Sequence, residues 1–283
     1  MTRTTIPVTS TPTPTRAAPS RFPSAVVLFV IAALGVGAPF LALSTVITPD
    51  APFLLAAVIF GLALPALILT YREAGGAAVR ALLRDCVRLP SSWWWLPLAA
   101  FGLAVVTWTT GAALGGAQPL TWGLAAFYVS DLIVGAIVIN IWEEMAWTGF
   151  FQRRVASRWG SIGGALVTSV FFTAIHVPLA LAGADGAREI ASNLILMAGV
   201  ATGVRLLIAR VDPWCGRSLL TIGILHSSFN ASETLLDADH FWVRIAITIA
   251  LGIGLIAFGK ESTPHGPTPA ACSPKMIPQS RPS

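Results

Sequence analysis

Charged side chains are scarce in this sequence. They make up 11% of the 283 residues, against 55% for hydrophobic residues, and the mean hydropathy is +0.74. A soluble domain of this length needs more surface charge, so the composition excludes the soluble classes of protein. It predicts an all-α, multi-pass protein of a cell membrane, because helices satisfy their own backbone hydrogen bonds in lipid. The net charge of +5 then bears on topology, and nucleic acid is not an expected partner.

Cysteine and lysine are rare as well. The three cysteines, Cys86, Cys215 and Cys272, lie far apart and in no metal-ligand spacing, which excludes a disulfide framework and a cysteine-based zinc site. Only two of the 18 basic residues are lysines. Together with the abundant alanine, this use of arginine indicates a GC-rich bacterial coding sequence.

Apolar segments divide the chain into about eight predicted membrane spans. They cover residues 24–47, 51–71, 93–114, 122–151, 161–182, 190–208, 217–236 and 241–258. Residues 72–90 carry four arginines and predict an amphipathic helix on the membrane surface. The Thr/Pro-rich residues 1–23 and the Pro/Thr/Ser-rich residues 260–283 predict disordered tails, which leaves one membrane domain at 24–259.

The distribution of arginine and lysine predicts the orientation of these spans. With both termini on the inner side, 16 of the 18 basic residues fall in inner segments, Arg205 among them, and only Arg188 and Arg244 fall outside. Positive charge concentrates on the cytoplasmic side of membrane proteins. The bias therefore predicts an eight-span bundle with the N-terminus and the C-terminus inside, since a miscount by one span would scramble the alternation.

Two adjacent carboxylates, Glu143 and Glu144, interrupt the fourth apolar segment. Counting back from Arg153 at about 1.5 Å per residue places Glu143 roughly 15 Å deep, near the middle of a hydrocarbon core of about 30 Å. Ionised groups at that depth are costly unless they meet partners or water, and they usually mark function. The pair therefore predicts a functional site inside the membrane.

Two further segments carry the histidines that could accompany these carboxylates. His176 follows Phe172 by one helical turn, and Asn230 follows His226 by one turn. A single membrane histidine usually provides only an interhelical hydrogen bond. The combination with a carboxylate pair instead favours catalysis.

Depth along the helices tests whether these groups can meet. His226 lies nine residues from the inner end of its segment, or about 14 Å deep, which matches the glutamates. His176 lies fifteen residues from the inner end of its own segment, or about 22 Å along an untilted helix. We therefore expect helix tilt or a kink at Pro178 to bring His176 to the common level.

In this order the motifs resemble those of the CPBP intramembrane proteases, which include type II CAAX prenyl endopeptidases and bacteriocin self-immunity proteins. That family carries Glu-Glu-x-x-x-Arg, Phe-x-x-x-His and His-x-x-x-Asn or Asp on three separate membrane helices. The corresponding residues are Glu143 with Glu144, Phe172 with His176, and His226 with Asn230. The resembling region spans about residues 122–236, and three ordered motifs are far more specific than any one alone.

One position departs from the family pattern. Thr148 stands where the first motif has its arginine, although the residues that follow it continue as in the family. That arginine would support a carboxylate without taking part in the reaction, so its loss alters the charge balance of the glutamate pair and leaves the reacting groups in place. If the site merely lost a supporting partner, Thr148→Arg should be tolerated.

The resemblance implies an intramembrane endopeptidase acting on membrane-associated proteins or peptides. Peptide hydrolysis requires an activated water, a proton shuttle and donors for the oxyanion. By resemblance, Glu143 would activate the water and His176 would help to hold it. His226 and Asn230 would stabilise the oxyanion, and Glu144 would orient the set.

Zinc is an alternative that the residues leave open. Glu143, His176 and His226 could supply three zinc ligands with an open fourth position. The chain lacks His-Glu-x-x-His, and the family has been described both as metalloproteases and as metal-independent glutamic proteases. We favour a site that requires no cofactor.

Two other functions fit part of the pattern. A proton-coupled transporter would also use intramembrane glutamate and histidine, but transporters usually consist of two related halves and this sequence shows no such repeat. A catalytically inactive membrane scaffold would keep the fold and sequester a peptide, and Thr148 favours that alternative. Membrane lipid is the expected partner in every case.

Overall fold

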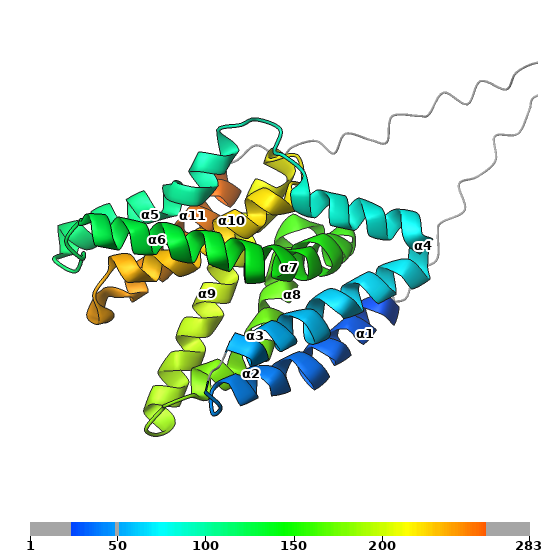
Figure 1. Cartoon of the computed structure of the whole chain (residues 1–283), viewed down its shortest axis with the longest axis horizontal. Helices are drawn as coiled ribbons and strands as arrows, with labels where there is room; N and C mark the ends of the chain where they lie inside the picture. Colours follow the sequence, from blue (N-terminus) through cyan, green and yellow to red (C-terminus); the bar gives the residue numbers. More distant parts are fainter. Residues whose placement is uncertain (1–23, 49–50, 259–283) are drawn as a thin grey trace, which may run out of the picture.

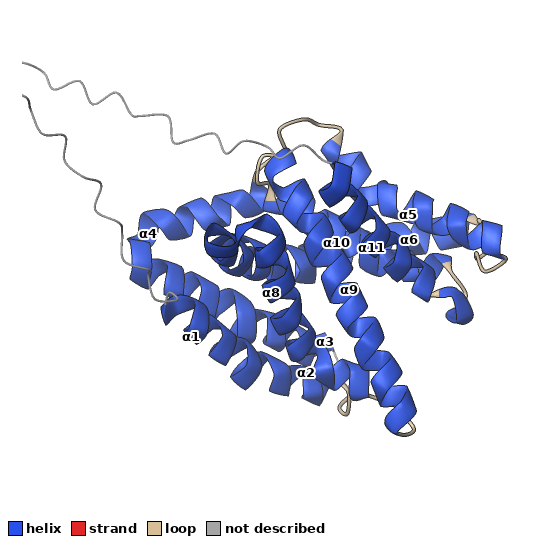
Figure 2. Ribbon diagram, turned by 180° about the vertical axis from the view of Figure 1, so that it is seen from behind, coloured by secondary structure: helices blue, strands red, loops and turns tan. Residues whose placement is uncertain are grey.

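A computed structural model describes residues 24–48 and 51–258 of the protein. Its regular structure is helical, as the sequence predicts, and the described residues add only one isolated antiparallel bridge, between Ala117 and Leu236 (Figure 1; Figure 2). The predicted tails at 1–23 and 260–283 lie outside the described residues, as does Asp50 of the first predicted turn.

The helices follow one another along the chain with few long loops. The α-helices are α1 (Ser24–Ala32), α2 (Ala38–Ser44), α3 (Ala51–Ala56), α4 (Leu64–Val87), α5 (Trp95–Leu114), α6 (Trp122–Gly135), α7 (Ile141–Glu144), α8 (Arg153–Leu181), α9 (Ala187–Trp214), α10 (Leu219–Ala231) and α11 (Trp242–Phe258). Four π-helical segments interrupt them: η1 (Ala33–Gly37), η2 (Ala57–Ala63), η3 (Ala136–Asn140) and η4 (Met145–Gln152). Two 3₁₀ turns, η5 (Ser232–Leu235) and η6 (Ala238–His240), precede α11.

Six of the described helical segments are long and apolar enough to cross a membrane. The 60-residue segment Trp122–Leu181 covers both the fourth and the fifth predicted spans, and it leaves helical geometry at Gly160, where φ is 73°. Helix α10 has 13 residues, fewer than the roughly 20 that a membrane-spanning helix needs. The count of eight and the orientation of the termini stay predictions.

A second change of direction follows the second predicted span. Gly75, in α4, has a φ of 71°, a backbone conformation that glycine adopts without steric cost. The chain turns there, and the arginine-containing part of α4 runs off at an angle to the first part (Figure 1). The turn lies four residues after Tyr71, at which the sequence predicts that the span ends.

Arg153 joins three chain segments at one end of the bundle. Its guanidinium donates to Asp85 at 3.1 Å, to Asp212 at 2.8 Å and to the carbonyl of Arg217 at 3.1 Å. These partners belong to α4, to α9 and to the turn before α10. The three arginine-rich segments therefore lie together, as the charge bias predicts for inner segments.

Loops from two other parts of the chain meet at the far end of α5. The backbone N–H of Gln118 donates to Leu235 at 2.9 Å, and that of Asp237 donates to Gly116 at 2.9 Å. With 20 residues, α5 is about 30 Å long and separates this end from the arginine-rich one. The loop after α5 and the segment after α10 therefore lie together, away from the arginine-rich end.

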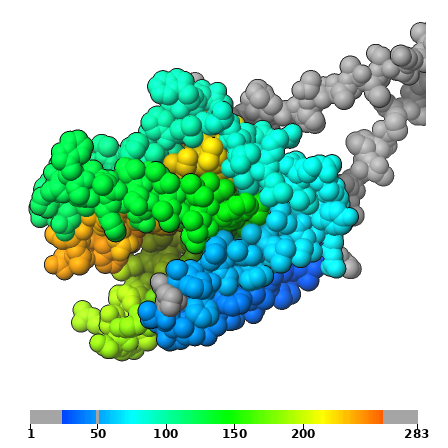
Figure 3. Space-filling model, in the orientation of Figure 1, coloured from blue at the N-terminus to red at the C-terminus, as the bar shows by residue number. Residues whose placement is uncertain are grey.

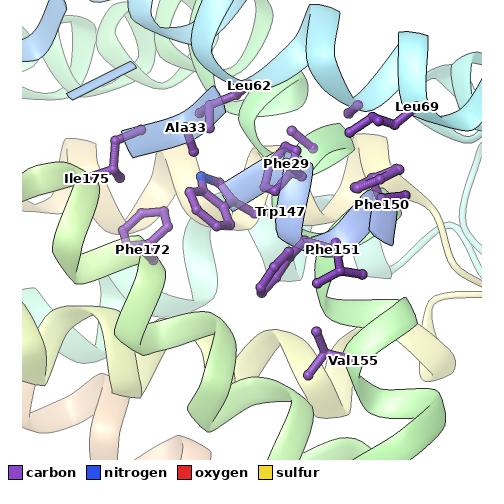
Figure 4. Close-up of a cluster of buried hydrophobic side chains, with 14 of the residues drawn as sticks. Phe29, Ala33, Leu62, Leu69, Trp147, Phe150, Phe151, Val155, Phe172 and Ile175 are labelled. Carbon is purple, nitrogen blue, oxygen red and sulfur yellow. The ribbon is translucent and has the colours of Figure 1, made fainter. Parts of the chain in front are cut away.

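An aromatic cluster fixes η4 against its neighbours. Trp147 lies 5.3 Å from Phe29, 5.7 Å from Phe151 and 5.7 Å from Phe172, measured between ring centroids and in edge-to-face geometry (Figure 4). Inside a membrane such rings are held by van der Waals packing, and edge-to-face pairs contribute about 0.5–1.5 kcal/mol each. The cluster anchors η4 to α1 and α8, directly beside the glutamate pair.

Helix α9 packs against α11 through its C-terminal half. A Cβ added to Gly203 would lie 3.0 Å from the backbone nitrogen of Ile249, so glycine permits this close approach. The N-terminal half of α9 stands apart from α11 and α6, and the molecular surface is hollowed between them (Figure 3). The site described below uses the packed half of α9.

Cysteine labelling from each side of the membrane tests the topology. Single cysteines at the exposed positions Asp185 and Asp239 should label from one side, and those at Arg80 and Arg158 from the other, because the basic segments lie inside. Labelling of Asp185 and Arg158 from the same side would contradict the alternation.

The native cysteines do not interfere with this experiment. Cys86 and Cys215 are buried, and burial raises the pKa of the Cys215 thiol to about 11, so its reactive thiolate is scarce at neutral pH. Cys272 lies outside the described residues and would be replaced by serine.

Candidate active site

The two glutamates occupy a single α-helical turn between two π-helical segments. This turn is α7, with η3 before it and η4 after it. π-Helical turns form i→i+5 hydrogen bonds and often occur at functional sites. Both side chains are buried, with 8% of Glu143 and 0% of Glu144 exposed.

Glu144 is bound by three side chains from three helical elements. Arg205 donates to both of its oxygens, at 3.0 Å from Nη1 to Oε2 and 2.5 Å from Nη2 to Oε1. Thr148 Oγ1 donates to Oε2, and His226 Nδ1 lies 2.7 Å from Oε1. A bidentate arginine–carboxylate pair is strong and fixes geometry. The carboxylate of Glu144 is therefore fully engaged.

Arg205 is a member of the buried cluster that the sequence prediction missed. The charge count assigns it to an inner segment, but its side chain lies inside the protein with 0% exposed, so that assignment is wrong. Its guanidinium lies 4.6 Å from the Phe172 ring centroid and 3.3 Å from Thr148 Oγ1. One signal was available, because Arg205 sits within an apolar helical run, where a charge needs a partner.

Glu143 is held much more loosely than its neighbour. It accepts a hydrogen bond from Asn140 Nδ2 at 3.3 Å, and its Oε2 lies 3.9 Å from His226 Nδ1. Asn140 precedes it by three residues, so a local helical pair provides this contact. Adjacent carboxylates thus have different surroundings, and the less engaged one is Glu143.

Helix α10 places His226 against Glu144. Its N-cap is Ser218, whose hydroxyl accepts from the backbone N–H of Thr221. Farther along, Ser227 donates to the carbonyl of Leu132 at 2.8 Å. A carboxylate can only accept, so His226 donates from Nδ1 and keeps Nε2 for another partner.

Close approach of α10 to α7 depends on Gly223. A Cβ added there would lie 2.9 Å from Ile141 Cα and 3.0 Å from Ile141 N, which are backbone atoms that cannot turn aside. Gly223 lies three residues before His226, and Ile141 lies three residues before Glu144. The glycine therefore sets the separation of the two site-bearing helices.

His176 reaches the same region from α8. Its Nδ1 donates to the carbonyl of Phe172 at 2.6 Å, which leaves Nε2 as an acceptor. The Phe172 ring centroid lies 4.4 Å from that of His176 and 5.9 Å from that of His226, so Phe172 packs against both imidazoles. His176 is half-buried. Helix α8 continues with helical geometry beyond His176, since Gly160 is the one described residue inside α8 with non-helical φ and ψ.

Asn230 stands apart from this buried group. It follows His226 by one turn on α10, but its side chain is exposed. The structure thus brings Glu143, Glu144, His226 and Arg205 into direct or near contact, with His176 nearby on the same Phe172 ring. Asn230 is not in that cluster.

A pocket of about 520 Å³ with polar and apolar walls adjoins the site on the side of Thr148. Its lining includes Thr148 and Gln152 from η4, Arg153 and Ser157 from α8, and Arg217. Gln152 also donates to the backbone carbonyl of Arg205 at 3.4 Å. Space and polar groups therefore lie next to Thr148, the position that departs from the Glu-Glu-x-x-x-Arg motif.

The zinc alternative can be compared with this geometry. Among the described residues, no three His, Cys, Asp or Glu side chains gather closely enough to hold a metal ion. Glu143, His176 and His226 therefore do not form a ligand set in this arrangement, although the contacts of Glu144 and the Phe172 carbonyl with the two Nδ1 atoms leave both Nε2 atoms available. No step below is routed through a metal.

Comparison with known proteins agrees with the motifs. A family model described as Type II CAAX prenyl endopeptidase Rce1-like matches residues 125–232, which include the three motifs and Arg205. A search of curated proteins gave no match. The family match supports a CPBP-family protein, and with its apolar helices the protein is a multi-pass membrane protein.

Gly223→Ala tests the helix approach that builds the site. The added methyl group must push α10 from α7, and overpacking of this kind costs about 1–3 kcal/mol, or a fall of roughly 2–10 °C in Tm. Thermal unfolding of the purified protein measures the change. Gly254→Ala in α11 is the matched control, because nothing lies within 4 Å of its added Cβ. Equal melting temperatures for the two variants would contradict the proposed steric role.

Proposed function

We propose that the protein is an intramembrane endopeptidase that hydrolyses membrane-associated proteins or peptides. The observation that carries this proposal is the unequal environment of the glutamate pair. Arg205, Thr148 and His226 engage Glu144, whereas Glu143 accepts a longer hydrogen bond from Asn140. One carboxylate organises the site, and the other is available as a base.

Glu143 acts as the general base. It takes a proton from a water molecule, whose oxygen attacks the carbonyl carbon of the scissile peptide bond. The C–N bond then breaks, and Glu143 returns the proton to the leaving nitrogen. His176 assists by accepting a hydrogen bond from that water through Nε2, the ring nitrogen that its bond to Phe172 leaves free.

His226 stabilises the oxyanion that forms on the carbonyl oxygen. Its Nδ1–H is bound to Glu144, so a second proton on Nε2 would give an imidazolium whose charge the carboxylate supports. Asn230 adds an amide donor from the next turn of α10. Because its side chain is exposed, it is available to a substrate that approaches the buried group.

The proposed mechanism requires no cofactor. Glu143 and the two imidazoles provide the base and the electrostatic stabilisation that zinc would otherwise supply. The mechanism therefore belongs to the glutamic class of proteases.

Arg205 removes the main argument for an inactive scaffold. That alternative rested on Thr148, which lacks the charge of the family arginine. Arg205 Nη1 lies 3.3 Å from Thr148 Oγ1 and binds the same carboxylate. The site therefore keeps a guanidinium, which favours the endopeptidase.

Substitution of the glutamates tests the proposal. Glu143→Gln is nearly isosteric and removes the base, so hydrolysis of membrane-anchored peptides should fall by at least about 10²-fold while the protein still folds. Glu144→Gln is the matched variant on the same turn, and it should leave more activity because Glu144 does not take the proton. Initial rates in detergent or in liposomes measure both effects.

Two outcomes would count against the endopeptidase. Unchanged hydrolysis in Glu143→Gln would exclude Glu143 as the base. If the parent cleaves nothing but Glu143→Gln abolishes proton-coupled uptake into vesicles, the transporter takes the place of the protease.

A further inference from the structure

We propose that Arg205 performs the task of the arginine that the first motif lacks at position 148, and that it is a positioning residue for His226. This inference rests on the proposed function, whose reacting groups it would align. The motif would place this positive charge at position 148, beside the glutamates, whereas in this protein Arg205 carries it on α9, 57 residues later in the chain.

Two positions in the protein can deliver a cation to Glu144. Residue 148 lies one helical turn beyond Glu144, on the face where i and i+4 side chains meet. In the structure Thr148 still binds Oε2 of Glu144, but its short side chain carries no charge. Arg205 reaches the same oxygen at 3.0 Å and lies 3.3 Å from the threonine hydroxyl. The two side chains therefore converge on one point.

Arg205 acts on the reaction through Glu144. Its two N–H groups bind both carboxylate oxygens, which fixes the rotation of the carboxylate as well as its charge. Oε1 of Glu144 in turn accepts from His226 Nδ1 at 2.7 Å. Fixing that oxygen holds Nδ1–H of the ring toward Glu144 and aims Nε2 at the reaction, where the imidazolium that the carboxylate supports donates to the oxyanion.

The surroundings hold Arg205 in this position. The Phe172 ring lies 4.6 Å from its guanidinium carbon, and Gln152 donates to its backbone carbonyl at 3.4 Å. Stability alone does not account for such a group, because buried ion pairs are often no more stabilising than apolar residues of similar volume. A role in aligning a reacting group explains why a fully buried arginine is present here.

The cavity beside Thr148 makes the relocation testable. Thr148 is 1% exposed, and with Gln152 it lines a pocket of about 520 Å³, so open space adjoins position 148. Thr148→Arg alone would place two guanidinium groups beside one carboxylate, and like charges in a buried site repel. It should therefore lower turnover by at least about 10-fold, contrary to the tolerance expected if the site had simply lost a partner.

The decisive experiment moves the charge back to the motif position. Arg205→Met keeps the apolar stem and removes the charge; kcat should fall by about 10²-fold with KM nearly unchanged, and Tm should fall by roughly 5–10 °C. The double variant Thr148→Arg/Arg205→Met should recover at least about 10-fold in kcat and about half of the lost Tm. Rescue in both readouts supports relocation of the motif arginine.

Controls separate this inference from the proposed function. In a Glu144→Gln background, Arg205→Met should cost little more, because the two residues serve one interaction. If Arg205→Met does not fold, Arg205→Lys replaces it, since a lysine point charge cannot bind both oxygens and should also lower kcat. Melting temperatures report the rescue even if the parent hydrolyses nothing, so failure of the protease leaves this test intact. The inference is overturned if the double variant has neither a higher kcat nor a higher Tm than the single variant with the same substitution at position 205, whether Arg205→Met or Arg205→Lys.

Discussion

The ion pair between Glu144 and Arg205 is the interaction on which the rest of the site depends. An ionised carboxylate inside a membrane bundle is costly to keep, and only a partner with matching geometry offsets the desolvation of both charges. Arg205 supplies that partner from α9, and both side chains are 0% exposed. Once this pair exists, the remaining lone pairs of Glu144 orient Thr148 and His226. Three helical elements and η4 must therefore pack at one place.

The packing around the pair serves this requirement. Trp147 anchors η4 through edge-to-face contacts with aromatic rings of α1 and α8 (Figure 4). Gly223 lets α10 approach α7 closely enough for His226 to reach Glu144, and Arg153 holds the arginine-rich ends of three segments together. Phe172 contacts the rings of both histidines and the Arg205 guanidinium. This motif residue therefore has a structural task within the site, although composition alone would treat it as packing.

Hydropathy and motif spacing predicted the all-helical membrane fold and brought Glu143, Glu144 and His226 to one region. They did not predict which side chains bind Glu144. A spacing rule relates only residues on the same helix, whereas Arg205 lies 61 residues after Glu144, on α9. The positive-inside rule counted Arg205 among the basic residues of the inner segments, because a count of charges cannot distinguish an interfacial arginine from a buried one. Hydropathy also cannot settle the number of spans. Gly160 divides one long helical segment without interrupting its hydrogen-bonded turns, and α10 has only 13 residues.

An unequal carboxylate pair is the central feature of this account, with Glu144 held by Arg205 and Glu143 left to activate water. The most direct measurement is the appearance of new protein termini after the purified protein is incubated with a membrane proteome in the presence of a metal chelator. We expect new termini from the parent and none from Glu143→Gln, because the base is lost while the Glu144–Arg205 pair is kept. New termini that Glu143→Gln also produces, or that form only after zinc is restored, would contradict the account.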